Sequence, residues 1–194
     1  ADTLASFQGL AKYHRQRYTI PVIAITGSNG KTTTKELTAA VLSSRWNVLK
    51  TEANYNNEIG LPKTLLQLTH EHQAAVVEMG MRQLGEIKLL ANIARPTVGV
   101  VTNVGETHIE RLGSIENIAK AKQELIDCLC ENSLAVLNGD DPFVRRMAQA
   151  AKGRVVLYGE ATDCTYRLRS YSLGGDGSTF CWQDADGASY QAVL

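Results

Sequence analysis

Short apolar runs that alternate with helical patterns are the feature that most constrains the fold of this chain. Segments with helical periodicity separate these apolar runs along the sequence. Strands without polar alternation are buried on both faces, so the pattern predicts a parallel sheet with helices on each side, a three-layer α/β fold. The predicted core strands are 22–26, 74–78, 97–103, 134–138 and 154–158, with a short strand near residue 48. The predicted helices are 3–16, 31–42, 59–68, 85–91, 115–129 and 142–150.

The pattern changes after about Asp163, where alternating runs are joined by glycine-containing turns of the kind found in hairpins. These runs cover residues 165–173, 178–182 and 189–194, and the turns cover 174–177 and 184–187. We therefore expect an antiparallel β appendage on the parallel core. The predicted organisation is a lead-in helix and linker at 1–20, a core at 21–162, and an antiparallel β portion of the same domain at 163–194.

Composition excludes several classes of protein. The 20 Lys and Arg residues balance the 20 Asp and Glu residues and the sequence pI is about 7.1, which argues against a general nucleic-acid binder. The apolar runs fall far short of the roughly 20 residues that a membrane-spanning helix needs, so no membrane span is expected. The cysteines, Cys128, Cys130, Cys164 and Cys181, lack the spacing of a metal site, and we expect free buried thiols in a reducing compartment.

The strongest functional signal lies between the first predicted core strand and its helix. Glycines there allow the backbone N–H groups to point inward, and the helix N-terminus and a lysine add positive charge, which suits a polyphosphate. The segment is Thr26-Gly27-Ser28-Asn29-Gly30-Lys31-Thr32-Thr33. It indicates a P-loop-type ATPase core with Thr32 on Mg²⁺, although Ile25 stands where the full P-loop pattern has a glycine. A glycine-rich turn that only caps a helix is the alternative.

Three polar side chains could hold a second metal ion near this loop, because ligands of parallel sheets bind beyond the carboxyl ends of the strands. Glu78 ends an apolar strand, and His108 lies in the loop after the strand 97–103. Lys122 projects from the apolar stripe of its helix, whereas Lys120 is rotated away from it. A lone His ligand beside oxygen donors would also admit Mn²⁺. The alternative for each side chain is an ordinary local hydrogen-bond partner.

Four motifs make the sequence similar to the Mur ligase family, ATP-dependent amide ligases of bacterial cell-wall synthesis. The first is the phosphate loop with Ile25 before it. The others are Asn54-Tyr55-Asn56-Asn57-Glu58-Ile59-Gly60-Leu61-Pro62, Val77-Glu78-Met79-Gly80, and Asn103-Val104-Gly105-Glu106-Thr107-His108 with Ala119-Lys120-Ala121-Lys122. Within the family, the second and fourth motifs resemble most the member that adds D-alanyl-D-alanine.

The resemblance implies roles for individual residues. The loop from Thr26 to Thr33, with Lys31, would bind the ATP phosphates, and Glu78 would share Mg²⁺ with Thr32. A second metal ion would be held by His108 and a carbamylated Lys122. Asn138 would contact adenine, although the Asp141-Pro142 that follows is also an ordinary helix start. Lys31, Glu78, His108 and Lys122 are the expected catalytic residues.

The resemblance also implies the partners of the intact enzyme: ATP, UDP-N-acetylmuramoyl-tripeptide and D-alanyl-D-alanine, in the bacterial cytoplasm. Family members have three domains, and the motifs here belong to the central one. Because the chain begins at Ala1 and stops within a strand-like run, we expect a piece of a longer protein. We expect this piece to be inactive without its N- and C-terminal domains, which would carry the acceptor sites, and the protein to be a monomer.

Alternatives remain open at this point. Another ligase of the superfamily, such as a folate polyglutamating enzyme, would share the phosphate loop. A nucleotide-dependent switch would share it too, but the guanine-specific Asn-Lys-x-Asp motif is absent from the sequence. A non-catalytic nucleotide-binding module is the third alternative.

Overall fold

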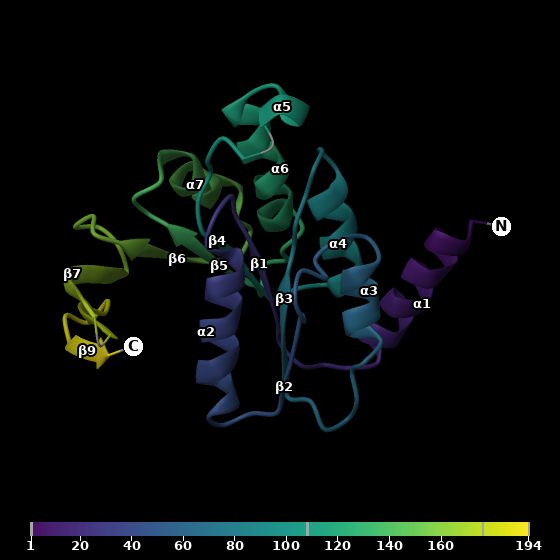
Figure 1. The fold of residues 1–194 in the computed structure, drawn as a ribbon, viewed down its shortest axis with the longest axis horizontal. Coiled ribbons are helices and arrows are strands. Elements are labelled where there is room, and N and C mark those ends of the chain that lie inside the picture. Colours follow the sequence, from purple (N-terminus) through teal and green to yellow (C-terminus); the bar gives the residue numbers. More distant parts are fainter. Residues whose placement is uncertain (1, 108, 176, 194) are drawn as a thin grey trace.

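A computed structural model describes residues 2–107, 109–175 and 177–193, and within them the strands form one mixed sheet of nine (Figure 1). The strand order is β2-β3-β1-β4-β5-β6-β7-β8-β9. Neighbours from β2 to β7 pair in parallel, whereas β7, β8 and β9 are antiparallel. The parallel strands are β1 Val22–Thr26, β2 Val48–Lys50, β3 Ala74–Glu78, β4 Val98–Val101, β5 Leu134–Asn138 and β6 Arg154–Gly159. They are followed by β7 Tyr166–Gly174, β8 Gly177–Gln183 and β9 Ser189–Val193. The predicted fold class is confirmed.

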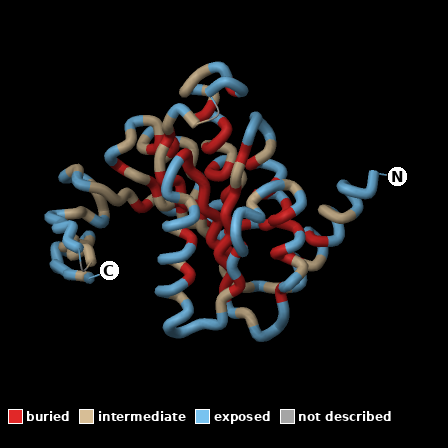
Figure 2. Tube along the Cα trace, viewed as in Figure 1, coloured by how far each residue is buried: buried red, intermediate tan, exposed pale blue. Residues whose placement is uncertain are grey.

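The helices form two unequal layers on the parallel part of the sheet. Helix α2 (Lys31–Ser43) covers one face over a small apolar cluster that includes Ile25 and Ala39. The opposite face carries the larger cluster, and the buried trace runs through the middle of the molecule (Figure 2). The helices of that layer are α1 Thr3–Gln16, α3 Gly60–Leu65, α4 Glu86–Ala94, α6 Ile115–Asp127 and α7 Pro142–Arg146. The three-layer prediction therefore holds, with most of the core on one side.

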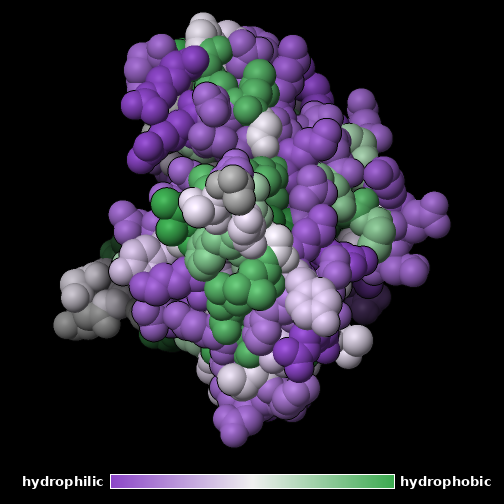
Figure 3. Space-filling view, turned by 90° about the vertical axis from the view of Figure 1, so that its right-hand side faces the viewer, coloured by the Kyte–Doolittle hydropathy of each residue, from purple (hydrophilic) through white to green (hydrophobic). Residues whose placement is uncertain are grey.

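Helix α1 is packed onto this larger layer. Ala11 is fully buried, and Arg15 is only 5% exposed. The Arg15 guanidinium donates hydrogen bonds to the carbonyls of Ala94 (2.9 Å) and Ile20 (3.2 Å), and its burial lowers the pKa of that group. The side of the molecule on which α1 lies is largely polar around a smaller group of apolar side chains (Figure 3). The proposed division of the chain near residues 20 and 162 stays a prediction.

Element ends differ from the predicted ones where local hydrogen bonding changes. The predicted helix 59–68 ends as α3 at Leu65, because the following residues form i→i+3 turns of the 3₁₀ type. The predicted strand 97–103 ends as β4 at Val101, since the side chains that follow bond to the phosphate loop. The predicted helix 142–150 divides into α7 and a 3₁₀ segment, Met147–Ala150. One short helix, α5 (Ile109–Leu112), was not predicted.

Two expectations from composition can be compared with the structure. The four cysteines are free thiols, as predicted, but the prediction that they are buried is wrong, since Cys130 is exposed and the other three are partly exposed. None of the helices in the described part of the chain has the length and apolar character that a membrane crossing requires.

Candidate nucleotide site

The turn between β1 and α2 leaves the start of the helix open to a ligand. Gly30 is in the left-handed region (φ 77°) and precedes the first helical residue, Lys31. No side chain caps this helix start, so the first backbone N–H groups keep their hydrogen-bonding capacity. An uncapped helix N-terminus with its partial positive charge is a ready site for phosphate.

The same turn is fixed against the end of β4. Gly27 has φ 153°, and a Cβ at this position would lie 1.9 Å from Thr102 Oγ1, so a larger residue cannot fit without displacement. The Thr102 hydroxyl donates to the Asn29 carbonyl (2.7 Å), and the Asn29 N–H donates to Asn103 Oδ1 (2.8 Å). The loop conformation is therefore set by neighbouring strands before any ligand binds.

Other loop residues divide between buried anchors and the exposed helix surface. The Thr26 hydroxyl donates to the Met79 carbonyl (2.9 Å), and the Ser28 hydroxyl bonds to the backbone of Gly105. Thr33 is exposed on the first turn of α2. Thr26 and Ser28 thus tie the phosphate loop to the ends of β3 and β4.

Lys31 lies over the loop. Its ammonium group donates to the carbonyls of Gly27 (2.9 Å) and Ser28 (3.2 Å). Partial burial lowers the pKa of Lys31, and the negative charge of Glu78 opposes that shift. A phosphate in the loop would offer this amine stronger, charged acceptors than the two carbonyls.

Glu78 and Thr32 meet at the rim of the sheet. Glu78 is 2% exposed, and its Oε2 accepts a hydrogen bond from the Thr32 hydroxyl (2.9 Å). Its Oε1 accepts from Asn56 Nδ2 (2.7 Å), and its backbone N–H donates to Thr51 Oγ1 (3.1 Å). A carboxylate and a hydroxyl oxygen at this spacing form a donor set that fits a hard cation such as Mg²⁺.

Lys122 is buried while Lys120 is exposed, as the helical spacing predicted. Lys122 is 2% exposed. Burial, and secondly the positive charge of Lys31, lower its pKa from 10.5 to about 7. A large part of the Lys122 population is therefore a neutral, nucleophilic amine at neutral pH.

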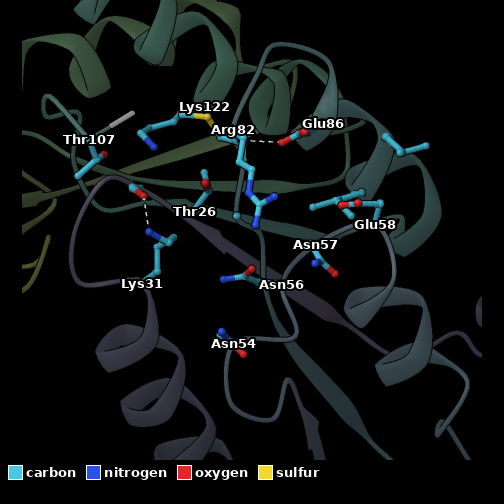
Figure 4. Close-up of a pocket in the computed structure, with 15 residues that line it drawn as sticks. Thr26, Lys31, Asn54, Asn56, Asn57, Glu58, Arg82, Glu86, Thr107 and Lys122 are labelled. Carbon is cyan, nitrogen blue, oxygen red and sulfur yellow. Dashed lines mark hydrogen bonds between the residues drawn. The ribbon is translucent and has the colours of Figure 1, made fainter. Parts of the chain in front are cut away.

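Some of these groups line a cavity of about 260 Å³ (Figure 4). Lys31 and Thr26 line it from the phosphate loop, and Lys122 lines it from α6. The hydroxyl of Thr107 is buried at the same cavity and has no hydrogen-bond partner among the described residues. The remaining lining residues are Gly27, Asn54, Asn56, Asn57, Glu58, Gly80, Met81, Arg82, Glu86, Leu89 and Leu90.

The other two predicted site residues are His108 and Asn138. His108 lies outside the residues that the structure describes, and the described part of the chain contains no cluster of three His, Cys, Asp or Glu side chains around one point. Asn138 bonds to local backbone, through its Nδ2 to the Thr102 carbonyl (2.9 Å) and through its Oδ1 from the Asp140 N–H (2.9 Å). The helix start at Asp141 is confirmed, since its Oδ1 accepts from Phe143 N–H (2.9 Å).

Sequence reasoning missed two residues that support the site. Lys35 on α2 is fully buried. Its Nζ donates to the Thr51 carbonyl (2.8 Å) and lies 3.0 Å from Glu36 Oε1. Its helical spacing to the buried Ala39 was a usable signal. Asn56 was noted only as part of a motif, and its contact with Glu78 could not be read from spacing.

The fold, the phosphate loop and the Thr32–Glu78 pair at the carboxyl edge of the sheet define a phosphate-loop nucleotide-binding domain of the α/β class. The model of the Mur ligase middle domain matches residues 25–192, which is most of the chain. The chain therefore belongs to the Mur ligase middle-domain family.

Relatives and solved structures agree with this assignment. The chain is 55% identical over 159 residues to UDP-N-acetylmuramoyl-tripeptide–D-alanyl-D-alanine ligase of Synechocystis, a match over 81% of this chain and 35% of that protein. A crystal structure of MurF from Acinetobacter baumannii superposes with a TM-score of 0.94 at 33% identity, covering 100% of this chain and 43% of that one. The structure of MurF ligase from Thermotoga maritima in complex with ADP superposes with a TM-score of 0.90 at 30% identity. The match covers 100% of this chain and 44% of that one. The chain thus spans less than half the length of these proteins.

Proposed function

We propose that this chain is the ATP-binding middle domain of a ligase that joins D-alanyl-D-alanine to UDP-N-acetylmuramoyl-tripeptide. The observation that carries the proposal is the carboxyl edge of the sheet, where the phosphate loop and the buried Lys122 line one cavity. The Thr32–Glu78 pair lies beside it, joined to the lining residue Asn56 through Glu78. The name and the 55% identity of the Synechocystis relative support this substrate pair over the folate alternative. The Thermotoga MurF structure in complex with ADP supports nucleotide binding by this fold.

The proposed reaction has two steps that both concentrate negative charge. A carboxylate of the tripeptide attacks the γ-phosphorus of ATP, ADP leaves, and an acyl phosphate forms. The amine of D-alanyl-D-alanine then attacks the acyl carbon, and phosphate leaves with formation of the amide. Preorganised donors aimed at this charge are the main source of rate in phosphoryl transfer.

The residues of this chain would supply those donors. The loop N–H groups and Lys31 bind the phosphates, and Thr32 and Glu78 hold Mg²⁺. Asn56 keeps the second oxygen of Glu78 in place through its 2.7 Å hydrogen bond. When bound, Mg²⁺ neutralises charge on the phosphate oxygens. Mn²⁺ would fit the same oxygen donors.

Lys122 is proposed to carry a carbamate. The lone pair of the neutral amine attacks the carbon of CO₂, one proton leaves the nitrogen, and a carboxylate oxygen ligand replaces a cation. The lowered pKa of Lys122 favours this reaction, because the protonated amine has no lone pair. With His108, the carbamate would hold a second metal ion, and Asn138 would contact adenine.

The setting of the enzyme follows from its substrates. We place it in the bacterial cytoplasm, where ATP and the UDP-linked precursor are available, as a monomer that needs further domains for its other substrates. The isolated middle domain is then a nucleotide-binding module without ligase activity.

Replacing Lys31 by Ala in the full-length ligase tests the proposal. We expect turnover to fall by at least about 100-fold, because one charged donor to the phosphates is lost. Lys120→Ala is the matched control, since Lys120 is exposed on α6. Product formation from ATP, the UDP-linked tripeptide and D-alanyl-D-alanine is measured, together with circular dichroism of each variant. A folded Lys31→Ala enzyme with a near-normal rate would remove the loop from the mechanism.

A further inference from the structure

The loop between β3 and α4 is held at both ends and projects one side chain into the cavity. At its start, the Gly80 N–H donates to the Asn56 carbonyl (2.9 Å), and a Cβ on Gly80 would lie 2.8 Å from Asn56 Oδ1. At its end, the Gly85 N–H donates to Glu124 Oε1 of α6 (2.7 Å). The loop backbone is therefore fixed to two neighbouring elements rather than free.

Arg82 lies in the middle of this loop. Its backbone N–H donates to Glu86 Oε2 (2.6 Å), so this carboxylate oxygen bonds to the Arg82 backbone and not to its guanidinium (Figure 4). The guanidinium makes no hydrogen bond or ion pair within the described chain, yet Arg82 lines the same cavity as Lys31 and Lys122. In Figure 4 it points into the middle of the cavity, with Lys31, Lys122 and Thr107 on one side and Glu58 and Asn57 on the other.

An arginine in this setting suits a planar anion. The five N–H donors of a guanidinium match a carboxylate in a bidentate arrangement. The phosphates already have the loop N–H groups and Lys31 on the wall formed by β1 and α2. An anion held by Arg82 would therefore lie between the β3–α4 loop and the terminal phosphate, which is where an attacking carboxylate must be.

We infer that Arg82 binds the carboxylate of the peptide substrate and orients it toward the γ-phosphate. The inference rests on the proposed function and adds a recognition residue for one of its substrates. Orientation by a bidentate contact places the reacting oxygen near the phosphorus without forming any covalent bond to the protein.

Kinetics of Arg82→Gln in the full-length ligase test the inference. We expect the KM for the UDP-linked tripeptide to rise about 10- to 100-fold, the loss usual for a charged hydrogen-bond pair, while the KM for ATP stays within about twofold. Arg82→Lys should recover only part of the loss, because an ammonium cannot form the bidentate contact. Arg45→Gln is the matched control, since Arg45 is an exposed arginine after α2. An unchanged KM for the tripeptide, or an equal rise in the KM for ATP, would overturn the assignment.

A substrate analogue separates recognition from a general effect on the fold. In the analogue, the attacking carboxylate of the UDP-linked tripeptide is replaced by a carboxamide, and binding is measured by calorimetry. The wild-type enzyme should lose affinity for the analogue, whereas Arg82→Gln should bind substrate and analogue equally, because the two changes remove the same contact. Equal losses in both enzymes would contradict the inference. Failure of the wild-type enzyme to form product would instead refute the proposed function on which the inference rests.

Discussion

The parallel strands and the antiparallel strands of this sheet differ in what surrounds them. Every residue of β1 and β3 is buried, because helices cover both faces there. In β7, β8 and β9 no described residue is buried, and side-chain stacking across the strands, such as Trp182 on Tyr190 at 5.5 Å between ring centroids, replaces a core. The two regions share hydrogen-bond ladders but not a common source of stability.

The difference explains where the chemistry lies. The carboxyl ends of parallel strands meet at one edge, so the phosphate loop after β1, Glu78 on β3 and Thr102 after β4 come together. Antiparallel strands alternate in direction and have no such common edge. A site that needs donors fixed to within fractions of an ångström is built on the elements with the densest packing.

The largest expected effect compares two leucines of these regions. Leu125 on α6 is fully buried and Leu173 on β7 is 75% exposed. Leu125→Ala should lower the free energy of unfolding by about 2–5 kcal/mol, since it leaves a cavity in the core. Leu173→Ala should change it by less than about 0.5 kcal/mol. Urea unfolding followed by circular dichroism measures both. Similar losses in the two variants would mean that the antiparallel strands contribute to the core as the parallel ones do.

A second comparison concerns a charge placed inside the parallel region. The pKa of Lys122 falls from 10.5 to about 7 on folding, so between those pH values the unfolded chain binds more protons than the folded one. The free energy of unfolding should therefore rise with pH across this window, by up to about 1.4 kcal/mol per pH unit. Below about pH 7 the amine is protonated in both states, so Lys122 should add no pH dependence there. Lys122→Met should flatten the slope in CO₂-free buffer, whereas Lys120→Met, at an exposed position, should keep it.

The same two variants test the carbamate. A carbonyl signal in ¹³C NMR after addition of ¹³CO₂ should be present in wild-type protein and Lys120→Met, and absent in Lys122→Met. A pH slope that survives in Lys122→Met would assign the titration to another group. Equal ¹³C signals in all three proteins would remove Lys122 as the carbamate site.

Periodicity predicted the parts of this fold that depend on burial alone. The continuous apolar runs gave the parallel strands, and the position of Lys122 between Ile118 and Leu125 gave its burial, because one helix face packs on the sheet. The common edge of parallel strands placed Glu78 near the phosphate loop, and the family resemblance paired it with Thr32. Burial of a helix face and the common edge of parallel strands can both be predicted once the type and direction of each element are known.

Contacts between loops were not predictable from periodicity. Asn56 reaches Glu78 because the chain after β2 folds back over the rim, and Arg82 enters the cavity because Glu86 and Glu124 fix its loop. Lys35 was overlooked because lysines are seldom fully buried without a partner, and here backbone carbonyls and Glu36 provide one. The contacts of Asn56 and of the Arg82 loop depend on distant segments that local sequence does not specify.

The smallest expected effect compares two aspartates that cap backbone turns in the two regions. Asp141 Oδ1 accepts from two N–H groups of α7, and its Oδ2 accepts from the Val104 N–H (2.8 Å) in the loop after β4. Asp184 makes a similar set of bonds between β8 and β9, to two backbone N–H groups and the Tyr190 hydroxyl, but these bonds are exposed, whereas those of Asp141 are partly buried.

Asp141→Ala should lower the free energy of unfolding by about 1–2 kcal/mol, because partly buried N–H groups lose their acceptor. Asp184→Ala should shift the urea midpoint less, since water replaces the lost acceptor at an exposed turn. Asn at either position keeps one acceptor oxygen and should recover part of any loss. A larger shift for Asp184→Ala than for Asp141→Ala would show that the antiparallel turn, rather than the packed rim, limits the stability of the chain.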